Sequence, residues 1–187
     1  MNVTSISRMP FSPDATWPEL GKFDSKITGV FWLLVVPLSL LPPAMIYFAG
    51  TSHGDAFFEG YSSRPWAMIA SIFFVCELLS VTWMGWLIRR VALAWNERIS
   101  HRNAYLVAAV AAIPLWISSL GLLVASTAFN VALDVGALIL SCGLVFQGVR
   151  SFCRIGDETI EQAIAITRLA FGGGLFAWGF LMLLIIV

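Results

Sequence analysis

The stretch AYLVAAVAAIPLWISSLGLLVA, residues 104–125, contains no charged side chain. A helix rises about 1.5 Å per residue, so about 20 apolar residues cross the ~30 Å hydrocarbon core of a bilayer. Four further apolar runs of similar length are present: Thr28–Gly50, Pro65–Leu87, Phe129–Val149 and Ala163–Val187. The quoted stretch and the run that follows it are separated only by residues 126–128, which predicts an antiparallel hairpin. The pattern predicts an all-α membrane protein, a single bundle of five transmembrane helices with short loops.

The composition supports a membrane protein. Hydrophobic residues make up 59% of the chain and charged residues 12%, with a mean hydropathy of +0.85. Soluble domains contain about 25% charged residues. We therefore expect an N-terminal cytoplasmic or interfacial segment at residues 1–27 and a five-helix transmembrane domain at residues 28–187. No apolar leader precedes Thr28, so the first span is expected to insert uncleaved.

The basic residues predict the orientation. Short cytoplasmic loops of membrane proteins are enriched in Lys and Arg. With a cytoplasmic N-terminus and five spans, only Arg64 of the eleven Lys and Arg residues lies outside. The other ten lie on the cytoplasmic side: Arg8, Lys22, Lys26, Arg89, Arg90, Arg98, Arg102, Arg150, Arg154 and Arg168. The C-terminus is then predicted outside.

The N-terminal segment contains a helix-start signal, TWPE at residues 16–19. Thr is a preferred N-cap, and the Glu three residues later matches a capping box. Trp17, Leu20 and Phe23 follow at three-residue steps, so a short helix on the membrane surface would bury them at headgroup level. The alternative is a disordered tail.

Prolines interrupt the first span, VVPLSLLPPAMIYF at residues 35–48. Pro37, Pro42 and Pro43 each lack a backbone donor and crowd the preceding turn. A broken helix is tolerated in a membrane where neighbouring protein or water satisfies the freed carbonyls. We expect the first helix to be kinked and to pack inside the bundle or line a cavity.

Small residues predict close packing in the later spans. Ala104, Ala108 and Ala112 recur at four-residue steps, a pattern that lets another helix approach closely, and Pro114 is expected to bend the same span. Glycines are frequent in the fourth and fifth spans and predict close contacts or bends: Gly136, Gly143, Gly148, Gly172, Gly173 and Gly174.

Three ionisable residues are predicted at membrane depth: Glu77, Asp134 and Arg168. Such groups face the bundle interior, find a partner or stay neutral. Glu77, near the midplane, is either a protonatable site on a solute path or a protonated carboxyl that donates to a carbonyl freed by the prolines. Arg168 can extend to the cytoplasmic headgroups or pair with Glu77. Asp134 lies near the outer interface, where it can be wetted or cap the short turn.

Motifs for catalysis are absent from the chain. It has no G-x-S-x-G elbow, H-E-x-x-H helix or phosphate-binding loop, and its two histidines are predicted on opposite sides of the membrane. The three cysteines are scattered and predict neither a disulfide framework nor a metal site. We expect no catalytic residue, no metal and no cofactor. Orientation and anionic lipid account for the inner arginines, so nucleic-acid binding has no support.

Several stretches together resemble a known family. They are FSPDATWPEL (Phe11–Leu20), LLPPAM (Leu40–Met45) and A-x-x-P-L-W (Ala111–Trp116), combined with five spans. The chain resembles the Yip1 domain family over nearly its whole length, most closely the short proteobacterial inner-membrane members. Eukaryotic members associate with Rab-type GTPases in vesicle traffic. Their D-L-Y-G-P motif is missing here, and of G-Y-x-x-x-P only Pro114 is matched.

The residues and the resemblance together favour an integral protein of the bacterial inner membrane that acts without catalysis. It would act by protein–protein or helix–helix contact, as in membrane organisation or a trafficking-like scaffold. The expected partners are membrane lipids and other membrane proteins or further copies of the chain. The alternative is a small transporter or channel subunit with a midplane site at Glu77 and the proline-broken first span.

Overall fold

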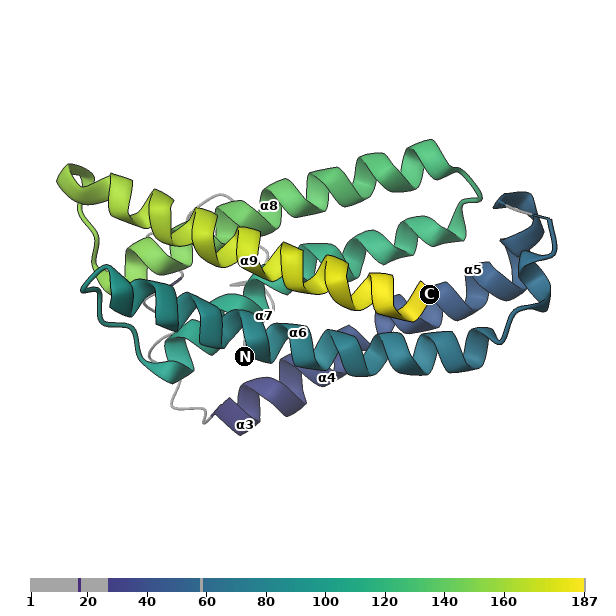
Figure 1. The fold of residues 1–187 in the computed structure, drawn as a ribbon, viewed down its shortest axis with the longest axis horizontal. Helices are drawn as coiled ribbons and strands as arrows, with labels where there is room; N and C mark the ends of the chain where they lie inside the picture. Colours follow the sequence, from purple (N-terminus) through teal and green to yellow (C-terminus); the bar gives the residue numbers. More distant parts are fainter. Residues whose placement is uncertain (1–16, 18–26, 58, 187) are drawn as a thin grey trace.

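The structure, a computed structural model, describes residues 17, 27–57 and 59–186. These residues form five helical rods and no strand, as the sequence predicts (Figure 1). The first rod is composite: α3 (Ile27–Val30), a π-helical segment (Phe31–Val35), α4 (Val36–Ser39) and α5 (Leu41–Phe57). The other four are α6 (Trp66–Ala94), α7 (His101–Ser118), α8 (Thr127–Cys153) and α9 (Ile160–Ile186). Short 3-10 turns occupy Tyr61–Ser63, Ser119–Leu123 and Asp157–Thr159.

Four rods are long and apolar enough to cross a membrane: Ile27–Ala56, Trp66–Ala94, His101–Leu123 and Thr127–Cys153. The fifth, α9, has 27 residues, the same number as α8, and packs against α6 and α8. The crossing of the membrane by α9 stays a prediction. Figure 1 shows the α5–α6 and α7–α8 connections at one end of the bundle and the α6–α7 and α8–α9 connections at the other.

The prolines interrupt the first rod, which confirms the predicted kink. Pro37 lies in the first turn of α4, directly after the π-helical segment, and Pro42 and Pro43 lie in the first turn of α5. A proline is tolerated in a first turn because its missing N–H has no helical partner there. The hydroxyl of Ser39, which is fully buried, donates to the Val36 carbonyl at 3.1 Å. The Val36 carbonyl thus finds a donor within the rod itself.

Helix α7 is the centre of the bundle. Every residue from Ala104 to Ala111 is buried, and α7 contacts the first rod, α6 and α8. Ala104 is 0% exposed and Ala108 is 3% exposed, while Ala112 is partly buried against the core. The predicted packing of the alanine stripe is therefore confirmed. A helix that is apolar on all sides belongs inside, because neighbouring helices then cover every face.

Glycines on the neighbouring helices allow the close approach to α7. A Cβ atom at Gly85 of α6 would lie 3.0 Å from the Cα of Tyr105 in α7. On α8, a Cβ at Gly148 would lie 2.6 Å from the Val107 side chain. Small residues in such places let helix backbones approach, and van der Waals contact is a main attraction between helices in lipid.

The other glycines divide between packed and open positions. On α9, Cβ atoms at Gly173 and Gly174 would collide with the Leu87 and Met84 side chains of α6. Among the described residues, no atom lies within 4 Å of the Cβ positions of four further glycines in α8 and α9: Gly136, Gly143, Gly172 and Gly179. Close packing inside the chain therefore explains only part of the glycine content.

Trp17 packs inside the protein, so the prediction that lipid headgroups bury its side chain is wrong. Its side chain is fully buried in the core that surrounds α7, and its ring lies edge-on to Phe152 with 5.8 Å between centroids. The absence of a side chain at Gly148 makes room for it, because a Cβ there would lie 3.1 Å from the indole ring. The remaining predicted cap residues, at 16, 18 and 19, and Leu20 and Phe23 lie outside the described residues.

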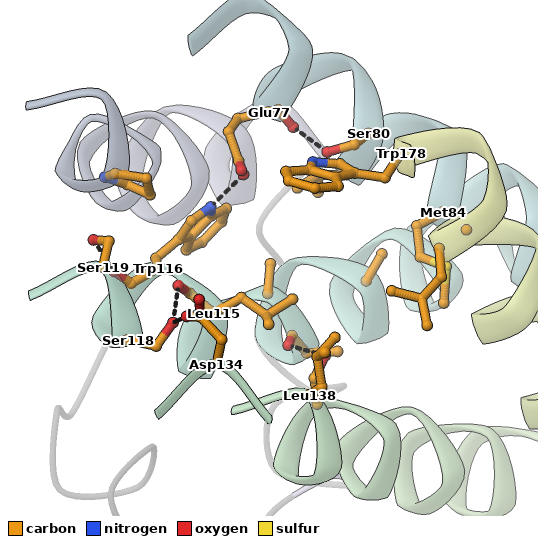
Figure 2. Close-up of a pocket in the computed structure, with 18 of the residues that line it drawn as sticks. Glu77, Ser80, Met84, Leu115, Trp116, Ser118, Ser119, Asp134, Leu138 and Trp178 are labelled. Carbon is orange, nitrogen blue, oxygen red and sulfur yellow. Dashed lines mark hydrogen bonds between the residues drawn. The ribbon is translucent and has the colours of Figure 1, made fainter. Parts of the chain in front are cut away.

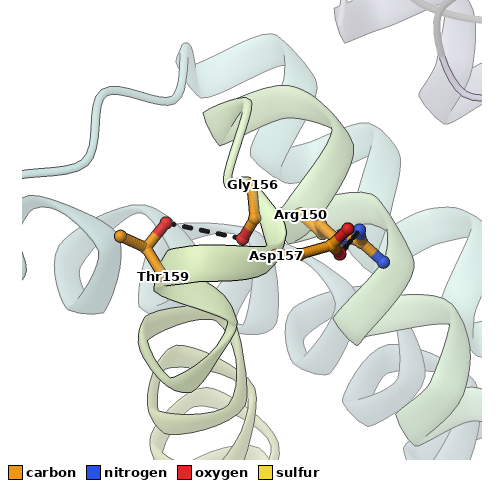
Figure 3. Close-up of polar contacts among 4 residues, drawn as sticks. All are labelled: Arg150, Gly156, Asp157 and Thr159. Carbon is orange, nitrogen blue, oxygen red and sulfur yellow. Dashed lines mark hydrogen bonds and ion pairs between the residues drawn. The ribbon is translucent and has the colours of Figure 1, made fainter.

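The connection between α8 and α9 is held by polar contacts (Figure 3). Arg150, in the last turn of α8, forms an ion pair with Asp157. Arg154 adopts the left-handed conformation, with φ at 57°, and ends α8. The Thr159 hydroxyl then donates to the Gly156 carbonyl at 3.5 Å. These contacts turn the chain back so that α9 runs antiparallel to α8.

Candidate functional site

A cavity of about 430 Å³ lies inside the bundle, and all five rods contribute to its wall. The first rod contributes Pro42 and Ile46, and α7 contributes the side that includes Ala108 and Trp116. Most of the wall is apolar. Its polar side chains come from α6, α7 with the turn after it, and α8: Glu77, Ser80, Ser118, Ser119, Asn130, Asp134 and Ser141.

Glu77 points into this cavity from α6 and is held by α7 (Figure 2). The indole nitrogen of Trp116 donates to its Oε2 atom at 2.8 Å. Trp116 is 1% exposed, and a buried indole N–H usually finds an acceptor. Glu77 therefore faces the bundle, on a cavity that Pro42 also lines.

The predicted partners of Glu77 are wrong. The sequence suggested a carbonyl of the first span or Arg168, whereas the carboxylate accepts from Trp116. Arg168 is exposed on α9 and forms no ion pair with Glu77. The extension of Arg168 to the headgroups stays a prediction.

Asp134 ties α8 to α7. Its Oδ1 atom accepts from the Ser118 hydroxyl at 2.8 Å, and its side chain is otherwise exposed (Figure 2). The prediction that it caps the short turn is wrong. Ser126 caps α8 by accepting from the Phe129 N–H at 3.4 Å, and the Asn130 amide donates to the Val124 carbonyl at 3.2 Å. Asp134 lies one turn beyond these contacts and reaches the facing helix instead.

Pro114 lies within α7, which continues through it to Ser118. Near it, the buried Ser141 hydroxyl of α8 donates to the Ala111 carbonyl at 2.6 Å. A proline disturbs the carbonyls of the preceding turn, and a neighbouring hydroxyl can satisfy one of them. These three contacts, Trp116 with Glu77 of α6 and Ser118 and Ala111 with α8, hold α7 beside the cavity.

Sequence reasoning missed Trp116 and Ser118 as site residues. One of these could have been found: Ser118 and Asp134 are each eight residues from Ser126, so an antiparallel hairpin places them opposite each other. The Trp116–Glu77 contact joins residues 39 positions apart on helices whose relative rotation no sequence pattern indicates.

The site has the chemistry of a binding pocket. The part of the chain that the structure describes contains no group of three or more His, Cys, Asp or Glu residues able to hold a metal ion. The three cysteines are free. Glu77 and Asp134 carry the carboxylates of the cavity wall, and no Lys, Arg or His lines it among the described residues. The cavity can therefore attract positive charge.

Comparison with known protein families matches residues 8–185 to the Yip1 domain. No curated protein and no solved structure matches the chain. The matched residues include all four apolar spans, the cavity wall and both of its carboxylates. With nearly the whole chain inside the match, the chain belongs to the Yip1 domain family.

Proposed function

We propose that this protein acts in the bacterial inner membrane by contact with other membrane chains, without catalysis. Yip1 domain proteins are multi-span membrane proteins and are generally non-catalytic. The proposed partners are lipids together with a second membrane protein or another copy of the chain. Nucleic acid has no place in this function.

The observation that carries the proposal is the placement of four outward glycines. Gly136 and Gly143 on α8 are seven residues apart, as are Gly172 and Gly179 on α9, so each pair lies on one helix face. No atom of the described structure lies within 4 Å of any of the four Cβ positions. Glycine weakens a helix by about 1 kcal/mol relative to alanine. A partner helix that needs close backbone approach would explain both pairs.

The proposed contact between α8 and a partner helix can be tested with a photoreactive residue in place of Leu140. Leu140 lies between Gly136 and Gly143 and is 53% exposed. We expect illumination of native membranes to give a protein adduct, whose mass distinguishes a second copy from another protein. Gly136→Leu with Gly143→Leu should reduce the adduct about tenfold, because bulky side chains block the approach. Val131→Leu, on another face of α8, is the control. Adducts with lipid alone, or an unchanged yield in the double variant, would contradict the contact.

We propose a cytoplasmic N-terminus and an outer C-terminus. The bundle end that bears the α6–α7 and α8–α9 connections carries Arg98, Arg102, Arg150 and Arg154, and the opposite end carries Arg64 (Figure 1). This asymmetry supports the orientation. Reporter fusions at Val187 and between Trp95 and Ser100 should report opposite sides of the membrane. The same side for both fusions would show the topology to be wrong.

The cavity supports a second candidate function, the binding or passage of a small solute at Glu77. Transporters often bind their substrates near the bilayer midplane beside interrupted helices. Here Glu77, Asp134 and the interrupted first rod border one cavity. The chemistry of that cavity indicates which solute it would take.

A further inference from the structure

The cavity wall carries two carboxyl groups and, among the described residues, no basic side chain to pair with them. Glu77 uses Oε2 for Trp116, and Asp134 uses Oδ1 for Ser118, while the described residues provide no donor for Glu77 Oε1 or Asp134 Oδ2. No basic side chain lines the wall among these residues. A carboxylate in an apolar, membrane-embedded site is costly unless it is neutralised or paired. A cation would pair with these oxygens.

The rest of the wall fits the body of an organic cation. Four aromatic residues from α6, α7 and α9 line the cavity: Phe73, Trp116, Phe171 and Trp178. Phe73 and Trp178 lie edge-to-face with 5.9 Å between their centroids. Aromatic faces attract ammonium groups, most strongly where water is excluded. A volume of about 430 Å³ lies within the range of sites for small organic molecules.

We propose that the cavity binds a lipophilic organic cation, which is an ammonium group attached to an apolar group. Glu77 and Asp134 would pair with the charge of the ammonium group, and the four aromatic side chains would contact the rest of the ligand. The proposed ligand rests on the second candidate function, the solute site at Glu77, and is independent of the outward glycines. An anion is disfavoured by the two carboxylates. A compact divalent metal ion is disfavoured because it prefers several oxygen ligands held together, which the described residues lack.

The access route lies beside Asp134. This residue is exposed and also lines the cavity, so the cavity reaches the surface of the protein beside Asp134. Leu175 of α9 is likewise exposed and part of the wall. A ligand can therefore enter from the membrane or its interface without unfolding the central helix.

The test uses radiolabelled benzyltrimethylammonium and the full chain in the non-ionic detergent dodecyl maltoside. We expect saturable binding of one molecule per chain. Neopentylbenzene, the uncharged molecule of the same shape, should compete only at a concentration at least about tenfold higher, because it lacks the charge. Glu77→Gln and Asp134→Asn should each weaken binding by about tenfold, since each removes one charge and keeps the shape.

Two further variants test whether binding depends on the cavity or on carboxylates elsewhere in the protein. Glu161→Gln removes an exposed carboxylate of α9 that does not line the cavity and should leave binding unchanged. Ala112→Trp fills the cavity and should abolish binding. If Glu77→Gln does not fold, Asp134→Asn carries the test, because that side chain is exposed. Equal competition by neopentylbenzene, full affinity in both charge variants, or no saturable binding by the folded chain would each overturn the proposal. The photo-crosslink at Leu140 of α8 tests the proposed helix contact separately, so none of these binding results would contradict that contact.

Discussion

Replacement of Trp116 by alanine is expected to lower the free energy of unfolding by about 3–5 kcal/mol, the usual cost of removing a buried tryptophan side chain. Trp116 is 1% exposed on the central helix, and its indole N–H is the donor to Glu77. The substitution therefore enlarges the cavity and removes a contact between α6 and α7. Unfolding titrations of the purified protein in mixed micelles would measure the change.

Trp116→Phe separates the two contributions. Phenylalanine keeps most of the apolar contact but has no N–H, so Glu77 loses its donor at a cost of about 1–3 kcal/mol. A double-mutant cycle with Glu77→Gln isolates the coupling between the two side chains. Equal stability of the wild type and Trp116→Ala would show that Trp116 does not hold these helices together.

Trp17→Ala is expected to destabilise the protein by a similar amount, about 3–5 kcal/mol. The side chain is fully buried against Phe152 and beside Gly148, so its removal leaves a void next to α7 and α8. The unfolding titration used for Trp116 would report the loss.

Trp32→Ala is the matched control for Trp17→Ala. Trp32 is 63% exposed on the first rod, and surface substitutions usually change stability by no more than about 0.5 kcal/mol. If Trp17→Ala were as stable as Trp32→Ala, Trp17 would lie at the membrane interface, as the three-residue pattern of its segment suggested.

The helices and their order could be predicted because they depend on local properties. An apolar run of sufficient length forms a helix in a membrane, since lipid provides no partner for free backbone groups. The three residues between the third and fourth runs leave room only for a tight turn, and α7 and α8 are indeed neighbours. The kink in the first rod likewise follows from Pro37, Pro42 and Pro43 themselves.

The burial of Trp17 and the partner of Glu77 could not be predicted, because each depends on how separate helices are rotated against one another. The sequence pattern around Trp17 is the same whether its side chain faces lipid headgroups or fills the space beside Gly148. Glu77 was expected to meet the first rod, yet a donor 39 residues away on α7 holds it. Rotation follows from side-chain packing between distant segments, which a one-dimensional pattern does not contain.

By itself, the sequence determined an all-helical membrane bundle, its hairpin and the interrupted first helix, because helix length, turn length and proline chemistry act within a few neighbouring residues. Only the tertiary structure decided that α7 is the central helix, that two carboxylates share one cavity without a basic partner among the described residues, and which glycines face outward. These properties arise where different helices meet, and a helix rotation of one residue position, about 100°, would change every one of them.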